Sequence, residues 1–540
     1  MKWVWIALLA VSFLFFAPLA GLFSQFSLTD FREMLASRGF LKALKVTLES
    51  GIIGSAFSVF FGLLFARKFA LYDWKGKRVE RLALLMPYLI PNFILATAFV
   101  VGWNPTSGLI NPLISFPGGL YGLIGMTVLF SVVHLPVAFL LLEDRFKKID
   151  GSLREAAKLS GAGPIKILCS IEIPLVLPTL VGAFALCFAL DVSAFAIPAW
   201  IGAPEKAYPL AYKIYQAIEV GGADGIPRAA GLSIVLFVLV IPILLVGSWV
   251  QRDESKFILV SGKAARVAEQ KADPLDLALF RIFFWVWQLA FWIAPLFVLF
   301  LSTLVKPGCL QEFGASCLKD ASLHTYHYVL FDLNETQLGF LGSMIYGTLS
   351  AVIIALGAFG LLLLFVKSRK VSRIADWVFT VPVSTPGAII ALGLIVTCSG
   401  KYGINLYNTA WIVVAAYILK HFNLAYQPMK NGLSNISKSL FEAAELSGAN
   451  RFQVWSKILV PMLKPEITGG FFLVLIPIIG ELTMSVFLVS PKFRSIGTVL
   501  FDLQDYADQS SAAALSVLLI ILILMVNELT RLISRGKLGY

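Results

Sequence analysis

One stretch of this chain occurs twice, and this repeat constrains the fold more than any other feature. Residues 152–178 read SLREAAKLSGAGPIKILCSIEIPLVLP, and residues 439–465 read SLFEAAELSGANRFQVWSKILVPMLKP. The two copies align without a gap at a shift of 287 residues, and each is a polar island between long apolar runs. A repeat of this size in so apolar a chain predicts two related membrane halves, each carrying one copy of the same water-exposed device.

Each copy predicts the start of a short helix. The S-x-x-E spacing of Ser152 with Glu155, and of Ser439 with Glu442, is that of a capping box. In this motif the Ser side chain accepts a hydrogen bond from an amide three residues on, and the Glu side chain reaches back. The Ala-Ala pair that follows each Glu is a strong helix former.

A glycine bend and a second helix complete the device. Gly161 and Gly448 lie six residues after the glutamates and suit the left-handed conformation that ends a helix. Pro164 then fits the first turn of a second helix, and Asn450 fits the cap of its counterpart. Both copies keep apolar side chains that could dock on a partner: Leu159, Ile165 and Leu168 in the first, and Leu446, Phe452 and Trp455 in the second.

The two stretches resemble the cytoplasmic EAA loop of the membrane subunits of binding-protein-dependent ABC importers. Its signature is Glu-Ala-Ala, three residues, Gly, nine residues, Ile, two residues, Pro. The matching residues are Glu155, Ala156, Ala157, Gly161, Ile171 and Pro174 in the first copy, and Glu442, Ala443, Ala444, Gly448, Ile458 and Pro461 in the second. Val460 stands where the family prefers Leu. The resemblance implies that each loop inserts into a cleft on an ATPase subunit and transmits its closure to the membrane helices.

Composition independently indicates a polytopic membrane protein. The chain is 58% apolar and 14% charged, and its mean hydropathy is +0.83. Its net charge of +12 is expected to belong to cytoplasmic loops and to face lipid headgroups, so we do not interpret it as nucleic-acid binding.

Apolar runs of spanning length predict an all-α fold of about 12 transmembrane helices, arranged as two parallel six-helix repeats. A first half over 1–255 and a second over 277–540 are joined by a charged cytoplasmic linker at 256–276. The run at 3–23 lacks a clean small-x-small cleavage site, so a first spanning helix is favoured over a cleaved signal peptide. The predicted spans are 3–23, 46–66, 82–102, 120–142, 174–200, 229–250, 282–304, 341–366, 377–398, 408–427, 466–489 and 511–533.

The distribution of charge predicts the orientation of these helices. With both termini in the cytoplasm, cytoplasmic segments hold 31 Lys and Arg, counting Arg531 at the end of the last span, against 12 in external segments, with Lys420 inside a helix. The positive-inside rule therefore favours this orientation, and both repeated loops then face the cytoplasm, where ATP is. The expected location is the inner membrane of a bacterium.

A pair of prolines opens the third predicted helix of each half. Pro87 and Pro91 in the first half correspond to Pro382 and Pro386 in the second. Proline breaks the backbone ladder, so a bend or a wide mouth is one interpretation, and a simple helix N-terminus is the other.

Four polar residues are expected inside the membrane. His134 and His421 each lie 21 residues before the glutamate of the repeat in their half, and a buried neutral His normally bonds a neighbour. The alternative is that this pair contacts substrate or a gate. Asp191 and Glu481 align after a three-residue slip, and because a lone carboxylate in lipid is costly, each should face the bundle interior, a cavity or a partner. A translocation-pathway lining and a hydrogen-bonded helix kink both remain open for these carboxylates.

Other motifs are missing or isolated. SGKAA at 261–265 lacks the leading Gly and the Ser or Thr of a phosphate-binding loop, and neither zinc-ligand spacing nor a nucleophile elbow occurs. We therefore predict a non-enzymatic chain without a cofactor or metal of its own. Cys309 and Cys317 share a predicted external loop, where a disulfide is one outcome.

The stretch after each membrane carboxylate resembles one group within this importer family. Residues 481–506 (ELTMSVFLVSPKFRSIGTVLFDLQDY) and 190–218 (LDVSAFAIPAWIGAPEKAYPLAYKIYQAI) resemble a segment of the iron(III), thiamine and 2-aminoethylphosphonate importers. The departures are Val192 and Ser193, where an aromatic and Gly are common, and Met484, where Ala is usual. The fused two-half layout is typical of the iron and thiamine branch, which makes iron(III) the first choice of solute.

The resemblance also implies the partners. Two ABC ATPase subunits would clamp the EAA loops, and a periplasmic or lipoprotein binding protein would deliver solute to an outer mouth formed by loops such as 201–228 and 490–510. A twelve-helix secondary transporter driven by an ion gradient is the alternative from another class, with Asp191 and Glu481 as ion sites. Such a carrier has no need for two matched docking loops.

Overall fold

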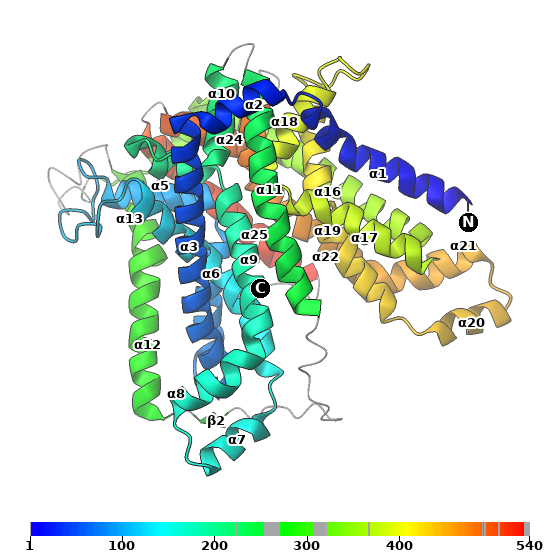
Figure 1. Ribbon diagram of the computed structural model, residues 1–540, viewed down its shortest axis with the longest axis horizontal. Coiled ribbons are helices and arrows are strands. Elements are labelled where there is room, and N and C mark those ends of the chain that lie inside the picture. The colour runs from blue at the N-terminus through cyan, green and yellow to red at the C-terminus, as the bar shows by residue number, and fades with distance from the viewer. Residues whose placement is uncertain are drawn as a thin grey trace. The chain divides into compact units, whose positions relative to one another are not determined.

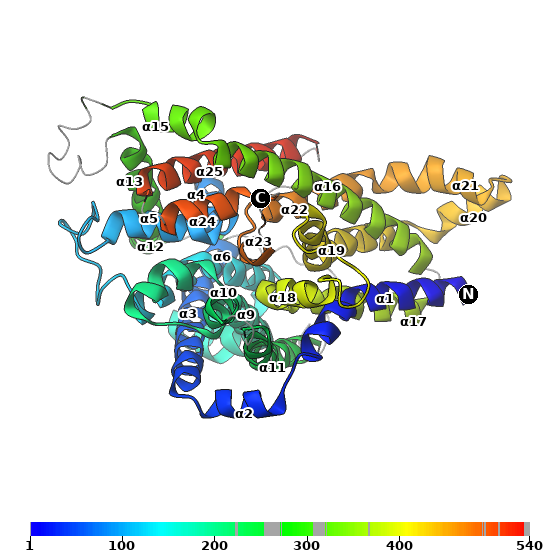
Figure 2. The same cartoon turned by 90° about the horizontal axis from the view of Figure 1, so that it is seen from above.

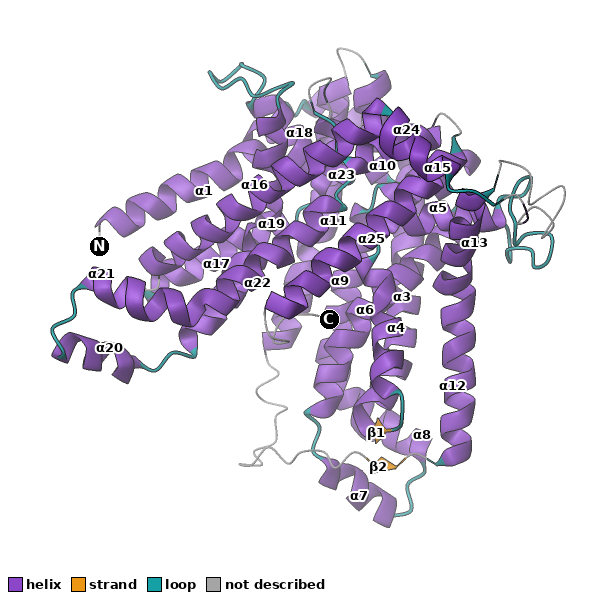
Figure 3. Ribbon diagram, turned by 180° about the vertical axis from the view of Figure 1, so that it is seen from behind, coloured by secondary structure: helices purple, strands orange, loops and turns teal. Residues whose placement is uncertain are grey.

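The computed structural model describes residues 2–221, 225–252, 270–271, 273–305, 319, 321–365, 368–488, 490, 493–505 and 508–533. Within these residues the named elements are helices apart from two short strands, β1 (Tyr72–Asp73) and β2 (Gln270–Lys271), which pair in parallel (Figure 3). Nine of the described helices are long and apolar enough to cross a membrane, and the number rises to eleven if two bent helix pairs each count as one span. An all-helical polytopic membrane protein is thereby confirmed.

The expected number of twelve spans differs from this result at one helix. The predicted span at 408–427 does form a helix, α19 (Ala410–Ser434), but it is not among the nine or eleven. Lys420, His421 and Asn423 interrupt its apolar sequence, so its hydropathy is too low for it to be recognised by composition alone.

Contacts divide the chain into two compact units, and each is described here by itself. The first, which we call the α7 unit, comprises Leu28–Gly221 and Gly231–Ser322. The second, the α20 unit, comprises Met1–Ser27, Gly222–Ala230 and Leu323–Tyr540. Neither follows chain order, because the first helix of each sequence half belongs to the unit built around the other half.

The α7 unit is built around one long helix. Helix α3 packs along α6 and α9, and its core is rich in Phe side chains such as Phe65, Phe69 and Phe139. The short α7 and α8 lie at one end of the unit (Figure 1). Its helices are α2 (Leu28–Ala36), α3 (Arg38–Leu71), α4 (Lys77–Leu89), α5 (Asn92–Trp103), α6 (Leu123–Lys147), α7 (Gly151–Leu159), α8 (Pro164–Ile167), η1 (Leu168–Glu172), α9 (Ile173–Ser193), η2 (Pro198–Gly202), η3 (Ala203–Glu205), α10 (Leu210–Val220), most of α11 (Gly225–Arg252), α12 (Pro274–Gln288), η6 (Leu289–Ile293) and α13 (Ala294–Leu304).

The α20 unit repeats the same packing scheme. Helix α16 packs against α19 and α22, as α3 packs against α6 and α9. The short α20 and α21 project beyond α22 (Figure 3). Its helices are α1 (Lys2–Phe23), α15 (His324–His327), η8 (Tyr328–Asp332), α16 (Asn334–Phe365), α17 (Arg369–Ser384), α18 (Gly387–Thr397), α19, α20 (Lys438–Leu446), α21 (Arg451–Val454), η9 (Trp455–Leu459), α22 (Val460–Ile479), α23 (Thr483–Leu488), α24 (Ile496–Asp505) and α25 (Gln509–Ile533).

The exchanged first helices make close contacts in the units that receive them. Helix α1 packs on α17 and α18 of the α20 unit (Figure 2), and the backbones approach so closely that a Cβ atom at Gly393 would lie 2.5 Å from the Pro18 carbonyl oxygen. In the α7 unit, α13 packs on α5, and Phe284 of α12 is buried in the core. Small residues at such contacts are the usual way in which membrane helices approach one another.

Both proline pairs coincide with a sharp bend. Helices α4 and α5 meet at 96°, and the second pair, from Lys370 of α17 through α18, meets at 101°. The breaks fall at Pro91 and Pro386, each of which caps the second helix of its pair. Each bend therefore lies where a new helix begins, so both interpretations of these prolines describe part of the structure.

Candidate functional site

In the repeated loop of the α7 unit, the N-cap residue is Asp150, which precedes the predicted Ser152 by two residues. Helix α7 starts at Gly151, and the carboxylate of Asp150 accepts the N–H of Ser152 at 3.0 Å. The capping box expected from Ser152 and Glu155 is therefore wrong in detail, because Ser152 already lies inside the helix. Aspartate is among the strongest N-cap residues, so Asp150 takes the role.

The second loop shows the same displacement. Helix α20 starts at Lys438, and the Ser437 hydroxyl, in place of the expected Ser439, accepts the N–H of Ser439 at 3.3 Å. The following cap agrees with expectation. The Asn450 side chain accepts the backbone N–H of Gln453 at 2.9 Å, and the Gln453 side chain accepts the backbone N–H of Asn450.

The glycine bends are confirmed at both loops. Gly161 has a φ of +76° and Gly448 a φ of +75°, a conformation that disfavours every residue with a side chain. Pro164 lies in the first turn of α8, as predicted. Each loop is therefore a helix, a left-handed glycine and a second helix.

Both loops present apolar and acidic side chains to the exterior. Leu159 and Leu446, which are equivalent in the repeat, are each 90% exposed, and Ile165 is 78% exposed. Glu155 and Glu442 are exposed as well. Exposed leucines on a short polar hairpin are available to a protein partner.

A matched irregularity, which the sequence analysis missed, joins each loop to its membrane helix. The π-helical turns η1 (Leu168–Glu172) and η9 (Trp455–Leu459) occupy identical positions in the repeat. Pro174 and Pro461, two residues beyond, have no N–H to continue the α-helical ladder. In the first loop, the N–H of Ile173, just before Pro174, donates to the carbonyl of Leu168, five residues back. The paired prolines were the sequence signal that could have predicted these turns. Such π-turns often mark functional sites.

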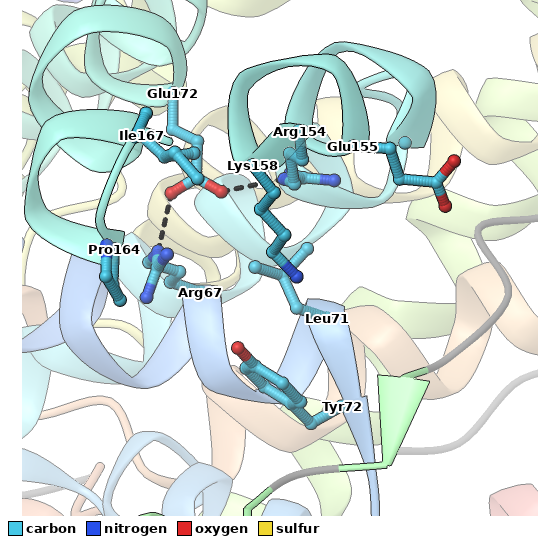
Figure 4. Close-up of a pocket in the computed structure, with 11 residues that line it drawn as sticks. Arg67, Leu71, Tyr72, Arg154, Glu155, Lys158, Pro164, Ile167 and Glu172 are labelled. Atoms are coloured by element: carbon cyan, nitrogen blue, oxygen red, sulfur yellow. Dashed lines mark hydrogen bonds and ion pairs between the residues drawn. The ribbon is translucent and has the colours of Figure 1, made fainter. Parts of the chain in front are cut away.

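An ion-pair cluster that the sequence analysis also missed holds the first loop (Figure 4). The buried carboxylate of Glu172 accepts Nε of Arg154 on α7 at 2.7 Å and Nε of Arg67 on α3 at 2.5 Å. The corresponding positions of the second loop are Phe441 and Leu459. No motif indicated this cluster, because Arg67 is distant in sequence.

The membrane carboxylate of the α7 unit is paired. Asp191 accepts the Ser55 hydroxyl at 2.7 Å, and its other oxygen lies 2.5 Å from Nδ1 of His134. Gly54 leaves room for the carboxylate, since a Cβ atom there would lie 3.0 Å from it. His134 thus hydrogen-bonds a neighbour, and both residues are buried.

The corresponding residues of the α20 unit have different hydrogen-bond partners. Glu481 follows the end of α22 and accepts the N–H groups of Met484 and Ser485 at 2.7 and 3.0 Å, so it caps the start of α23. His421 does not join it: its buried Nε2 has no hydrogen-bond partner among the described residues. The neighbouring Lys420 donates to the carbonyls of Val383 and Thr385 at the bend between α17 and α18.

Two further expectations concern cysteines and metals. Cys309 and Cys317 lie outside the described residues, so the disulfide stays a prediction. Within the part of the chain that the structure describes, no group of three or more His, Cys, Asp and Glu side chains is arranged to hold a metal ion.

The fold and the paired loops define a multi-pass membrane component of a transport system. The family of binding-protein-dependent transport system inner membrane components matches residues 58–252 and 356–538, more than half of the chain. The chain belongs to this family, whose members are non-catalytic permease subunits located in the inner membrane.

Several curated proteins are similar over much of the chain. A ferric transport system permease protein, FbpB, of Actinobacillus pleuropneumoniae is 23% identical over 82% of this chain, and the match spans 64% of that protein. A probable ABC transporter permease protein, y4fN, of Sinorhizobium fredii is 23% identical over 81% of this chain and 77% of its own length. A putative 2-aminoethylphosphonate transport system permease protein, PhnU, of Salmonella typhi is 26% identical over 37% of this chain and 75% of its own.

The cap at Asp150 yields a first prediction. Asp150→Ala should make the Ser152 amide in the first turn of α7 exchange with solvent several-fold faster at neutral pH, because it loses its acceptor. The bond from the Ser152 backbone N–H holds the pKa of Asp150 below its ordinary value. The cap is therefore present above the ordinary pKa of about 4 and is lost as the pH falls through the lowered value. Hydrogen exchange with mass spectrometry measures both effects.

The control for this prediction is Asp144→Ala, which removes an exposed carboxylate that pairs with Lys148 and caps nothing. Equal exchange in α7 of the wild-type and Asp150→Ala proteins would show that Asp150 is not the cap.

Proposed function

We propose that this chain is the membrane-spanning subunit of an ATP-driven importer that carries a solute from an external binding protein into the cytoplasm. Two ATPase subunits would dock on the α7–α8 and α20–α21 hairpins. The observation that carries the proposal is the identical construction of the two hairpins: a left-handed glycine, an exposed leucine and a π-turn at matching positions. A duplicated docking surface is what a pair of ATPase subunits requires.

The construction of each loop supports a mechanical role. The helix that follows each bend runs into a membrane helix as one candidate span, Pro164–Ser193 in one unit and Trp455–Ile479 in the other. A displacement of α7 or α20 would therefore pass directly into α9 or α22. In the proposed cycle, ATP-driven closure of the ATPase pair pulls the loops together and opens the pathway outward, and hydrolysis resets it.

The proposed orientation places both termini and both hairpins in the cytoplasm. The excess of Lys and Arg on the segments assigned to that side supports it. The outer mouth for the binding protein would then include α10 and α24, which occupy equivalent positions in the repeat.

Iron(III) is the solute we propose, with thiamine and 2-aminoethylphosphonate as alternatives. The support comes from relatives that are named as ferric permeases, while PhnU, named for 2-aminoethylphosphonate, matches a shorter part of the chain. The secondary transporter is disfavoured because it leaves the duplicated hairpins without a purpose.

We also propose that Asp191, Glu481, His134 and His421 lie beside the translocation pathway. Both carboxylates sit within two residues of the place where the fifth helix of their half ends, and helix breaks are where transporters build sites. In this conformation each carboxylate bonds groups of its own unit. Solute contact would then require a conformational change that opens these bonds.

The glycine bends give a test of the docking role. Gly161→Val and Gly448→Val should each lower solute uptake at least about tenfold while ATP hydrolysis continues. A β-branched residue in the left-handed region costs upward of 1–2 kcal/mol and would turn the hairpin out of its docking geometry. Uptake and hydrolysis are measured together in proteoliposomes that contain the assembled complex.

Gly163→Ala is the matched control. Gly163 lies in the same loop with a φ of −72°, and no atom lies within 4 Å of the position of its Cβ. Full coupling in all three variants would refute docking through these hairpins.

The solute is identified by stimulation of ATP hydrolysis. The chain, its ATPase and its binding protein are reconstituted in lipid, and the binding protein is loaded in turn with iron(III), thiamine or 2-aminoethylphosphonate. We expect iron(III) to stimulate hydrolysis several-fold and the others not to. Uptake driven by a proton or sodium gradient, without any associated ATPase, would instead establish the carrier.

The pathway proposal is tested by substitutions that nearly preserve shape. Asp191→Asn with Glu481→Gln should reduce uptake at least about tenfold at unchanged detergent-solubilised monodispersity, because the amides keep the size and one acceptor oxygen of the carboxylates but carry no charge. His134→Gln with His421→Gln is assayed alongside. Glu528→Gln on α25 is the control, since it removes an exposed carboxylate that pairs only with Arg531 among the described contacts. Undiminished uptake in both double variants would place the pathway elsewhere.

A further inference from the structure

The pocket beneath the first docking hairpin carries an excess of positive charge. It lies between α7, α8 and the end of α3, has a volume of about 200 Å³, and is lined by Arg67, Arg154, Lys158, Glu155 and Glu172 among others. Three cations and two carboxylates line it, so positively charged side chains outnumber negatively charged ones. Figure 4 shows Arg67 and Arg154 on either side of Glu172, with Lys158 and Tyr72 reaching into the neighbouring space.

The guanidinium of Arg154 is also incompletely bonded. Only its Nε has a partner, the carboxylate of Glu172, and both Nη1 and Nη2 are buried without any partner among the described residues. The residue itself is 5% exposed. Buried charged donors without acceptors are costly. A negatively charged group bound in the pocket would supply the missing acceptor.

The position of the pocket indicates the source of that group. Helix α3 passes from its apolar span into a basic segment at Arg67 and Lys68, and basic residues continue at Lys75, Lys77 and Arg78. A basic pocket at the cytoplasmic end of membrane helices matches the headgroup region of the bilayer, where phosphates lie. That this end faces the cytoplasm rests on the proposed function.

The second hairpin has no such charges. Phe441 and Leu459 occupy the positions of Arg154 and Glu172, although the backbones of the two loops agree at the glycine and at the π-turn. The charged cluster is therefore not required to build the loop, which indicates a separate role for it.

We propose that this pocket is a binding site for a phosphate group, and that the phosphate belongs to an anionic lipid headgroup of the cytoplasmic leaflet. The phosphate pairs with Arg154 and lies near Arg67 and Lys158. Arg154 thereby holds Glu172 and the lipid at once, and the first hairpin is tied to both α3 and the membrane. The second hairpin has no such tie, so the two docking hairpins differ in their dependence on lipid.

The test counts lipids retained by the purified full chain. Protein in mixed phosphatidylglycerol and phosphatidylcholine nanodiscs is released and weighed by native mass spectrometry. We expect the wild-type protein to retain phosphatidylglycerol in preference to phosphatidylcholine, and Arg154→Gln to bind it at least about tenfold more weakly. This variant leaves Glu172 paired with Arg67, so no unpaired charge is created in the core. Arg154→Lys should restore part of the binding.

Lys166→Gln is the control, because it removes the same charge from an exposed position of α8 outside the pocket lining. Equal retention of phosphatidylglycerol by the wild-type, Arg154→Gln and Lys166→Gln proteins would overturn the proposal that a lipid headgroup binds there. So would equal retention of both lipids by the wild type.

A second arm separates the two sources of phosphate. In phosphatidylcholine alone, thermal unfolding is compared in inorganic phosphate and in chloride at equal ionic strength. If phosphate stabilises the wild type but not Arg154→Gln while no phosphatidylglycerol is retained, the site stands and its ligand is the free ion. Neither measurement requires an ATPase or a binding protein, so failure of the lipid site and failure of the importer assignment are distinguishable.

Discussion

In hydrocarbon, a backbone N–H or C=O that leaves the helical ladder must find another partner inside the protein. Two ionisable side chains of this apolar chain supply such partners where the ladder is interrupted. Lys420 bonds two carbonyls released at the bend between α17 and α18, and Glu481 bonds two N–H groups at the start of α23. The breaks at Pro386 and Gly480 are tolerated because a charged side chain from the same unit satisfies them. Lys420 and Glu481, which appear anomalous in so apolar a sequence, thus satisfy its irregular backbone.

The two halves agree in backbone and diverge in side chains. Left-handed glycines, π-turns and bent helix pairs recur at equivalent places. By contrast, Asp191 is paired with His134 and Ser55, whereas Glu481 caps a helix. Duplication thus preserved the mechanical frame, while each half acquired its own polar interior.

The sequence predicted the features that local chemistry determines. The glycines at 161 and 448, the proline bends and the Asn450 cap follow from the conformational limits of single residues. The first helical caps were misplaced, because Asp150 and Ser437 lie just outside the motif that drew attention to their neighbours. The Glu172 cluster and the unequal treatment of the two histidines depend on contacts across more than fifty residues. A repeat shows which segments are alike but not which segments touch.

The exchange of first helices has a consequence for synthesis in the cell. Helix α1 is synthesised before its partners α17 and α18, which begin only at Arg369 and Gly387. It therefore spends most of translation without the helices on which it finally packs. Its composition permits this, since no charged residue follows Lys2 within the helix. Helix α13 meets the opposite situation: its partner α5 is already in place when it is made. The two exchanged helices, alike in their final packing, assemble by opposite orders of events.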